Sequence, residues 1–244
     1  MARIWAHRGA SAYAPENTME AFEKAVRLGA QGVELDVHLS ADGELMVIHD
    51  EDIARTSDGA GRVADMTLAQ LRAFNYNKGF EDTYKMAAIP TLAEVYELIK
   101  PCGILVNVEV KTNANIYPGI ERKLIRMETD MGMRGRVLYS SFNHYTLGRL
   151  KSINRKAVLG VLYVNALLEP WRYAKHIGAQ ALHPRYEYIY RYPGFIERAH
   201  ACGIIVNAWT VNEAADIARL SDMGADVLIT DKPDLRIETG RQRP

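Results

Sequence analysis

Apolar residues gather in short runs along this chain, and longer stretches of mixed apolar and polar residues separate them. The runs that have the length and composition of buried β-strands lie at residues 3–7, 32–37, 45–49, 103–110, 136–141, 157–163, 179–183, 203–209 and 226–230. Most of the intervening stretches repeat their apolar positions with the period of a helix, as at 17–29 and 211–224. This alternation predicts a parallel sheet with crossover helices.

The linker at residues 38–44 is the exception. A parallel crossover needs about a dozen residues or more, so this short linker with its turn sequence "ADGE" predicts an antiparallel β-hairpin. When the run at 45–49 is set aside, eight strands remain, each with a crossover to the next. This repeat predicts an α/β fold of the TIM (β/α)8 barrel type, with a short β-hairpin after strand 2. A doubly wound sheet is the alternative.

Residues 50–92 do not follow the strand–helix alternation. They hold several turn signals and one short helical pattern at 67–74, which predicts a small insertion over the C-terminal mouth of the barrel, as a lid or wall. We expect it to lie within a single domain that spans residues 1–244. After it, Thr91 and Glu94 have the spacing of a helix-starting capping box, and Asn17 and Glu20 have the same spacing before an earlier helix.

The composition limits the classes of partner and the cellular location that we expect for this protein. Of 244 residues, 48% are hydrophobic and 25% are charged, and Lys+Arg and Asp+Glu both number 30, so no basic excess predicts a nucleic-acid partner. The two cysteines, Cys102 and Cys202, are too few for a disulfide framework, and we expect both to be buried thiols. No apolar run reaches membrane-spanning length, which predicts a cytoplasmic protein without stable membrane association.

Acidic residues alternate on two of the predicted strands. Glu34 and Asp36 are two residues apart and therefore share one face of their strand, and Glu109 and Lys111 repeat this pattern on the third barrel strand. The plainest interpretation of the second pair is a buried ion pair. Taken together, however, three carboxylates and one lysine leave a negative site, which a hard cation such as Mg²⁺ or Ca²⁺ would neutralise. No cysteine lies at these strand ends, which disfavours zinc.

Two histidines are predicted at the same mouth. His7 closes the first strand, and His49 ends the returning strand of the hairpin, near the level of Glu34. Histidines beside a hard metal suit general acid–base chemistry near neutral pH. Arg8 and Lys111 add cations that could hold an anion, so the set predicts phosphoryl chemistry.

Short motifs reinforce this interpretation, and in chain order they are "HRG" (7–9), "PENT" (15–18), "ELDV" (34–37), "HD" (49–50), "IPTL" (89–92), "EVK" (109–111), "SFN" (141–143), "AWTVN" (208–212) and "TDKP" (230–233). As an ordered set that spans residues 4–234, they resemble the glycerophosphodiester phosphodiesterases. That family is a TIM barrel with a small insertion after the His-Asp pair, in agreement with the pattern above.

The resemblance implies roles for nine residues. The acid–base pair would be His7 and His49. The ligands of one divalent cation, Mg²⁺ or Ca²⁺, would be Glu34, Asp36 and Glu109. The substrate contacts would be Arg8 and Lys111 at the phosphate, with Trp209 and Phe142 lining the glycerol pocket. For these two aromatic residues, packing is an equally good interpretation.

The implied reaction is metal-dependent hydrolysis of a small-molecule glycerophosphodiester to sn-glycerol 3-phosphate and an alcohol. Its nucleophile is either the glycerol 2-hydroxyl, which gives a cyclic phosphate, or water. One alternative is a lysophospholipase D or phospholipase C-like enzyme that acts on lipid or glycosylated glycerophosphodiesters. Another is a non-catalytic barrel that binds a phosphorylated polyol, although the paired histidines argue against it.

The alcohol group is poorly specified by the sequence. Residues 184–193 carry tyrosines at alternate positions, namely Tyr186, Tyr188, Tyr190 and Tyr192. In an extended segment these would face one way and could stack on a sugar or hold a choline-type cation. The alternative is an aromatic wall packed on the barrel or on a second copy in a homo-oligomer.

The remaining histidines have no supporting motif. We expect a structural role for His183 and surface or packing roles for His38, His144, His176 and His200.

Overall fold

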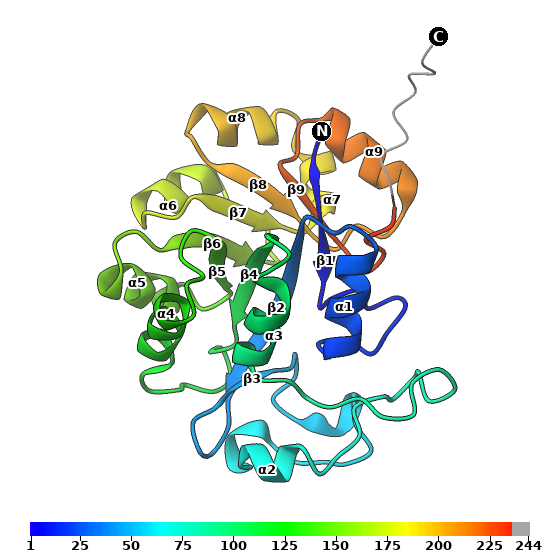
Figure 1. The fold of residues 1–244 in the computed structure, drawn as a ribbon. Helices are drawn as coiled ribbons and strands as arrows, with labels where there is room; N and C mark the ends of the chain where they lie inside the picture. Colours follow the sequence, from blue (N-terminus) through cyan, green and yellow to red (C-terminus); the bar gives the residue numbers. More distant parts are fainter. Residues whose placement is uncertain (236–244) are drawn as a thin grey trace.

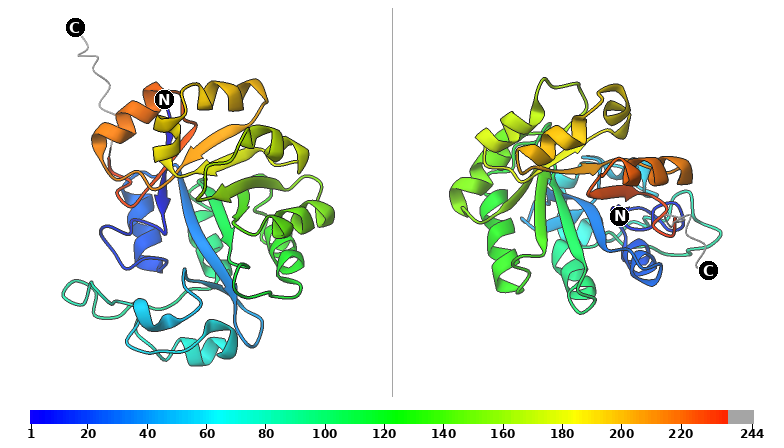
Figure 2. Two further views of the ribbon diagram at one scale, coloured as in Figure 1. Left: turned by 180° about the vertical axis from the view of Figure 1, so that it is seen from behind. Right: turned by 90° about the horizontal axis from the view of Figure 1, so that it is seen from above.

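A ring of parallel strands forms the centre of the molecule, and helices cover its outer face (Figures 1 and 2). The computed structural model describes residues 1–235. Within this range the ring comprises β1 (Arg3–His7), β2 (Gly32–Leu39), β4 (Leu105–Val110), β5 (Val137–Ser141), β6 (Val158–Tyr163), β7 (Ala181–Pro184), β8 (Ile205–Ala208) and β9 (Val227–Thr230). β1 pairs with both β2 and β9, so the sheet closes and the predicted TIM barrel is confirmed.

The strand β3 (Leu45–Val47) lies outside the ring. It pairs antiparallel with β2, with Val37 opposite Val47, as the short linker predicted. Gly43 takes a φ of +83° in the turn, and Ser40 Oγ accepts a hydrogen bond from the Glu44 amide at 2.8 Å. The hairpin therefore returns the chain from the end of β2 at Leu39 to the level of Asp36, whose carbonyl accepts from the Ile48 amide at 3.1 Å, and His49 follows there.

Helices of ordinary length link the strands, namely α1 (Met19–Arg27), α3 (Leu92–Ile99), α4 (Ile120–Asp130), α5 (His144–Ile153), α6 (Pro170–His176), α7 (Tyr186–Arg191), α8 (Phe195–Ala201) and α9 (Ala214–Asp222). Thr91 caps α3 in the predicted capping box with Glu94. The capping box predicted at Asn17 is wrong, because Thr18 caps α1 and accepts from the Ala21 amide. Asn17 instead adopts a φ of +56° and donates its side-chain amide to a buried carboxylate of the site.

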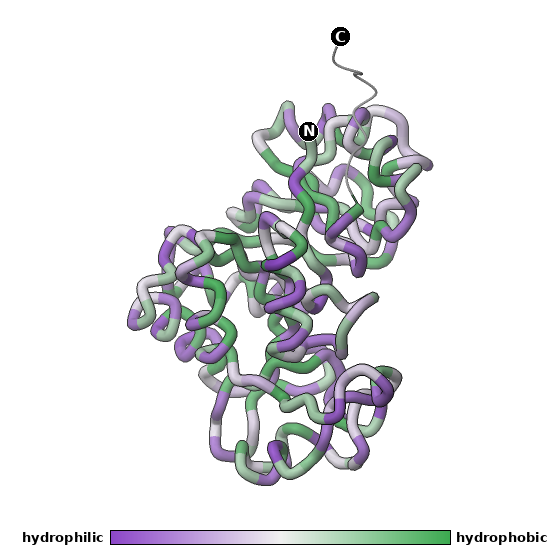
Figure 3. Tube along the Cα trace, turned by 45° about the vertical axis from the view of Figure 1, so that its right-hand side comes forward, coloured by the Kyte–Doolittle hydropathy of each residue, from purple (hydrophilic) through white to green (hydrophobic). Residues whose placement is uncertain are grey.

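The barrel interior is packed below the mouth. The indole of Trp5 lies against Gly32, where a Cβ atom would come within 2.6 Å of the ring. Trp5 belongs to a small buried cluster with Leu138, Ala181, Val227 and Ile229. Hydrophobic stretches run through the middle of the chain trace (Figure 3). A second, larger buried cluster joins the outer faces of the strands to the helices. This packing leaves the carboxyl end of the barrel as its open end.

The segment between β3 and α3 lies beyond the ends of β1 and β2 (Figure 1). It holds two 3₁₀ helices, η1 (Ile53–Arg55) and η2 (Val63–Asp65), and the short helix α2 (Leu68–Leu71), which occupies part of the predicted 67–74. Its apolar side chains form their own buried cluster with two residues of the hairpin, Met46 and Ile48. The insertion is thus a separately packed layer at the mouth of the barrel.

The expectation of buried thiols is wrong. Cys102 is exposed and Cys202 is partly exposed, because each lies in the turn that follows a helix. Among residues 1–235, no helix is both long enough and apolar enough to cross a membrane.

Candidate active site

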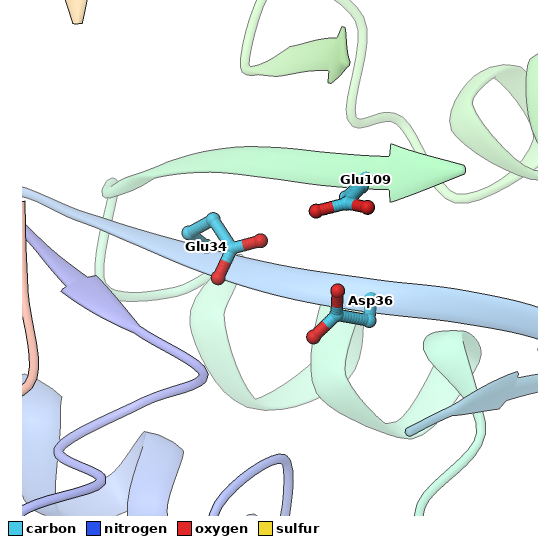
Figure 4. Close-up of side chains that lie close together, drawn as sticks. All are labelled: Glu34, Asp36 and Glu109. Atoms are coloured by element: carbon cyan, nitrogen blue, oxygen red, sulfur yellow. The ribbon is translucent and has the colours of Figure 1, made fainter. Parts of the chain in front are cut away.

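Three carboxylates meet at the mouth of the barrel (Figure 4). Glu34 and Asp36 come from β2, and Glu109 comes from the neighbouring β4, directly paired with Asp36. One oxygen of each carboxylate lies within 4.8 Å of the other two. All three side chains are buried, with at most 8% of any residue exposed. The structure therefore brings together the three acids that the sequence singled out.

Their electrostatics show that the charges are only partly balanced. Burial, and then repulsion from Asp36, raises the pKa of Glu34 well above its usual range and the pKa of Glu109 to about 7. Burial would also raise the pKa of Asp36, but Lys111 and Arg8 hold it below its ordinary value. Lys111 Nζ lies 2.9 Å from Glu109 Oε1 and 3.6 Å from Asp36 Oδ1.

The donor set fits a hard divalent cation. The Asp36 Oδ1 atom is buried and has no hydrogen-bond partner among the described residues. Three buried carboxylates whose charges are only partly balanced form the oxygen-rich environment that Mg²⁺ or Ca²⁺ occupies in proteins.

His7 is held by an acid that directly follows β9, the last strand of the ring. Its Nδ1 atom lies 2.6 Å from Asp231 Oδ1, which also accepts from Ser11 Oγ at 2.9 Å. Burial would raise the pKa of Asp231, but the hydrogen bond and charge of His7 lower it to about 2. His7 Nε2 lies 4.0 Å from Glu34 Oε2, beside the acidic triad. The role of Asp231 was missed from sequence, although its motif "TDKP" was noticed.

His49 has a comparable partner in the adjacent residue. Its Nδ1 atom lies 2.5 Å from Asp50 Oδ1, and its carbonyl contacts His38 Nε2 at 3.0 Å. His38 is fully buried and bonds Tyr117 Oη, which is the packing role that we expected for it. Burial lowers the pKa of His49, so its neutral form is favoured at neutral pH.

Arg8 sits in an unusual backbone conformation. Its φ of +55° is left-handed, which costs a non-glycine residue about 1 kcal/mol or more. In return, its amide donates to Glu34 Oε2 at 3.1 Å, and its guanidinium reaches Glu16 Oε1 at 2.9 Å and lies 3.5 Å from Asp36 Oδ2. The strained turn therefore aims one residue at two acids of the triad.

A cavity of about 240 Å³ joins these groups. Its lining includes both histidines, Arg8, Glu34, Glu109, Phe142 and Trp209. The rings of Phe142 and Trp209 meet edge to face with centroids 6.0 Å apart, and Trp209 Nε1 donates to the His183 carbonyl at 2.7 Å. His183 also lines the cavity, but it is fully buried, and burial lowers its pKa to about 3.

The tyrosine-rich stretch is helical, not extended. In α7 the rings pair at a spacing of four residues, Tyr186 with Tyr190 edge to face and Tyr188 with Tyr192 stacked. Tyr190 also donates to Asp216 at 2.8 Å. The idea that all four rings face one way is therefore wrong, because helical spacing divides them into two pairs.

Comparison with known proteins agrees with this geometry. Residues 7–235 match the model of the glycerophosphoryl diester phosphodiesterase family. A glycerophosphodiester phosphodiesterase of Caldanaerobacter subterraneus subsp. tengcongensis is 42% identical over 239 residues, which cover 98% of each chain.

Solved structures agree as well. The glycerophosphodiester phosphodiesterase of Agrobacterium tumefaciens has a TM-score of 0.86 and 29% identity, over 98% of this chain and 100% of that one. An Oleispira antarctica phosphodiesterase in complex with the product sn-glycerol-3-phosphate has a TM-score of 0.85 and 28% identity, over 97% and 95% of the two chains. The barrel, the acidic triad and these matches lead to one conclusion: the chain belongs to the glycerophosphoryl diester phosphodiesterase family.

Proposed function

We propose that the chain hydrolyses small glycerophosphodiesters to sn-glycerol 3-phosphate and an alcohol, with one divalent cation, Mg²⁺ or Ca²⁺, and with His7 and His49 as the acid–base pair. The observation that carries the proposal is the convergence of three buried carboxylates, two of which line one cavity together with both histidines and Arg8. The named relatives and the product complex of the Oleispira protein support the substrate class.

In this proposal Glu34, Asp36 and Glu109 hold the cation. When bound, the cation supplies positive charge to the phosphate oxygens, as hard metals do in phosphoryl transfer. Arg8 and Lys111, both already paired with these acids, add cationic groups that hold the phosphate. The edge-to-face pair of Phe142 and Trp209 then forms an apolar wall against the carbon skeleton of the glycerol.

Proton transfer is assigned to the two imidazoles. The carboxylates of Asp231 and Asp50 face the Nδ1 atoms of His7 and His49, so each ring carries its proton on Nδ1 and leaves Nε2 to exchange a proton. One histidine removes the proton of the nucleophile, which is the glycerol 2-hydroxyl or water, and the other protonates the departing alcohol. The same carboxylates stabilise each imidazolium as it forms.

The test is a panel of substrates with detection of released glycerol 3-phosphate, with and without a chelator. We expect release from a water-soluble diester such as glycerophosphocholine, loss of release with the chelator, and recovery with Mg²⁺ or Ca²⁺. The panel includes a lysophospholipid and a glycosylated diester, which test the lipid-directed alternative. Following the reaction by ³¹P NMR shows whether a cyclic phosphate forms.

Substitution of the histidines tests their roles. His7→Ala and His49→Ala should each lower turnover by about 10²–10⁴-fold, the usual contribution of a general acid or base. His176→Ala is the matched control, because that histidine is exposed at the end of α6. A loss of less than about tenfold in both variants contradicts the acid–base assignment.

The expected homo-oligomer stays a prediction, and a measurement of the molecular mass in solution can check it.

A further inference from the structure

A line of ion pairs crosses the mouth of the barrel from His49 to Arg8, and Arg55 is its central member. Asp50 bonds His49 Nδ1 through Oδ1 and accepts from Arg55 Nε through Oδ2 at 2.5 Å. Arg55 Nη1 and Nη2 donate to the two carboxylate oxygens of Glu16 at 2.8 and 2.7 Å. Glu16 Oε1 also accepts from Arg8 Nη1 at 2.9 Å. One guanidinium and two carboxylates therefore link the proposed acid–base histidine, His49, to the proposed phosphate-holding arginine, Arg8.

Arg55 comes from the insertion, and its backbone is well fixed there. It is the last residue of η1, in which Ile53 is fully buried in the insertion's own apolar cluster. Asp52 caps the start of this 3₁₀ helix by accepting from the Ala54 amide at 2.8 Å. Lys78 Nζ donates to the Ala54 carbonyl at 2.8 Å. The side chain thus extends from a rigid base to the β1–α1 loop, which carries Glu16.

The geometry requires an arginine. A planar guanidinium presents parallel N–H groups to the Glu16 carboxylate and a third N–H to Asp50, whereas a lysine offers one compact charge. The side chain of Arg55 is 46% exposed. Ion pairs of half-exposed residues stabilise a fold by only about 0–1 kcal/mol, so stability alone gives little reason for this arrangement.

We propose that Arg55 is a positioning residue for phosphodiester cleavage, which orients the ring of His49 through Asp50 and the guanidinium of Arg8 through Glu16. This inference rests on the proposed function, because it takes His49 to move a proton and Arg8 to hold phosphate. Without Arg55, Asp50 is free to rotate away from His49 Nδ1. Glu16 then keeps Arg8 as its cationic partner and draws the guanidinium of Arg8 away from Asp36.

The experiment measures kcat and KM for glycerophosphocholine, with the divalent cation present. Asp50→Asn should mainly lower kcat, and Glu16→Gln should mainly raise KM. Arg55→Met should do both and lower kcat/KM by roughly 10- to 100-fold, since a small misplacement of a reacting group can cost about a hundredfold. Adding Arg55→Met to Asp50→Asn should leave kcat close to that of either single variant, because both act through one contact.

Two variants separate positioning from other effects. Arg62→Met is the matched control, because Arg62 also belongs to the insertion but donates to Asn115 in the β4–α4 loop; kcat and KM should stay within about twofold. Arg55→Lys keeps the charge but loses the paired N–H groups, so it should recover only a minor part of the loss. Full recovery by lysine would overturn the inference.

The inference would also be overturned if Arg55→Met lowered the melting temperature but left kcat and KM unchanged, because a purely structural role predicts that pattern. An inactive wild-type protein would overturn the proposed function and this inference with it. An active wild type with an unaffected Arg55→Met would overturn this inference alone.

Discussion

Glu109→Gln should make the metal-free protein more stable, against the usual effect of altering a buried site. Burial, and then repulsion from Asp36, raises the pKa of Glu109 from an ordinary value near 4.5 to about 7. The folded state therefore binds this proton more tightly than the unfolded state does. Ionising Glu109 therefore lowers the free energy of unfolding. This loss is absent below about pH 4.5, grows as the pH rises from about 4.5 to about 7, and is complete above about pH 7.

The size of the effect follows from the same values. Each tenfold change in proton affinity corresponds to about 1.4 kcal/mol, so holding Glu109 ionised costs the metal-free fold on the order of 3 kcal/mol at pH 8. Glutamine removes the charge but keeps an oxygen that can accept from Lys111. For a domain of this length, ~1 kcal/mol shifts the melting temperature by roughly 2–4 °C, so the variant should melt about 6–12 °C higher in chelator.

Excess Mg²⁺ or Ca²⁺ should reverse this stability order, so that the wild type melts at a higher temperature than Glu109→Gln. A ligand at a thousand times its Kd stabilises the wild type by about 4.1 kcal/mol, which exceeds the ~3 kcal/mol advantage of the variant in chelator, and the variant gains less because it has lost a ligand oxygen with full charge. Thermal melts of both proteins at pH 8, in chelator and in excess cation, measure this crossover. Glu128→Gln in α4 is the control, because that buried carboxylate accepts from Tyr139 Oη of β5, away from the triad. Its effect on the melting temperature should be the same in both conditions.

Wild-type melts that do not respond to the cation, together with a Glu109→Gln variant that is less stable in chelator, would refute the reasoning. The acids would then be a self-sufficient ion-pair cluster with Lys111 and Arg8.

Two further predictions concern the layers around the triad. Gly160→Ala places a Cβ within 2.6 Å of the His183 ring, which is fully buried, so it should destabilise by ~1–3 kcal/mol. By contrast, Gly148→Ala in α5 meets nothing within 4 Å and should stabilise by ~0.5–1 kcal/mol; urea unfolding of both variants checks the opposite signs. Asp231→Asn should lower the free energy of unfolding by about 2 kcal/mol at pH 7. The pKa of Asp231 in the folded state is about 2, so its ionised carboxylate stabilises the fold fully above about pH 4. The difference from wild type should shrink as the pH falls from 4 toward 2, and a difference that stays constant over this range would contradict the assignment.

The sequence determined the features that depend on neighbouring residues. Apolar runs located the strands, and the short linker at 38–44 decided the antiparallel pairing of β3. Alternation along a strand placed Glu34 and Asp36 on one face, and the same rule placed Glu109 beside Lys111. Because parallel strands end at one rim, these local patterns were enough to predict a shared acidic site.

The tertiary structure decided the choice between competing local patterns. Asn17 has the chemistry of a helix cap, but the buried carboxylate of Asp36 attracts its amide, and Thr18 caps α1 instead. The alternating tyrosines could serve a strand or a helix, and the loop after β7 folds them into α7.

The partners of site residues that are distant in sequence also came only from the fold. Asp231 lies 224 residues from His7 in sequence, and Arg55 lies 39 residues from Glu16. Barrel closure places β9 beside β1, and the packing of the insertion brings Arg55 to the first loop. Sequence periodicity reports which way a side chain faces along its own element. A hydrogen bond between distant segments depends instead on how those elements close on one another, and only the folded barrel determines that.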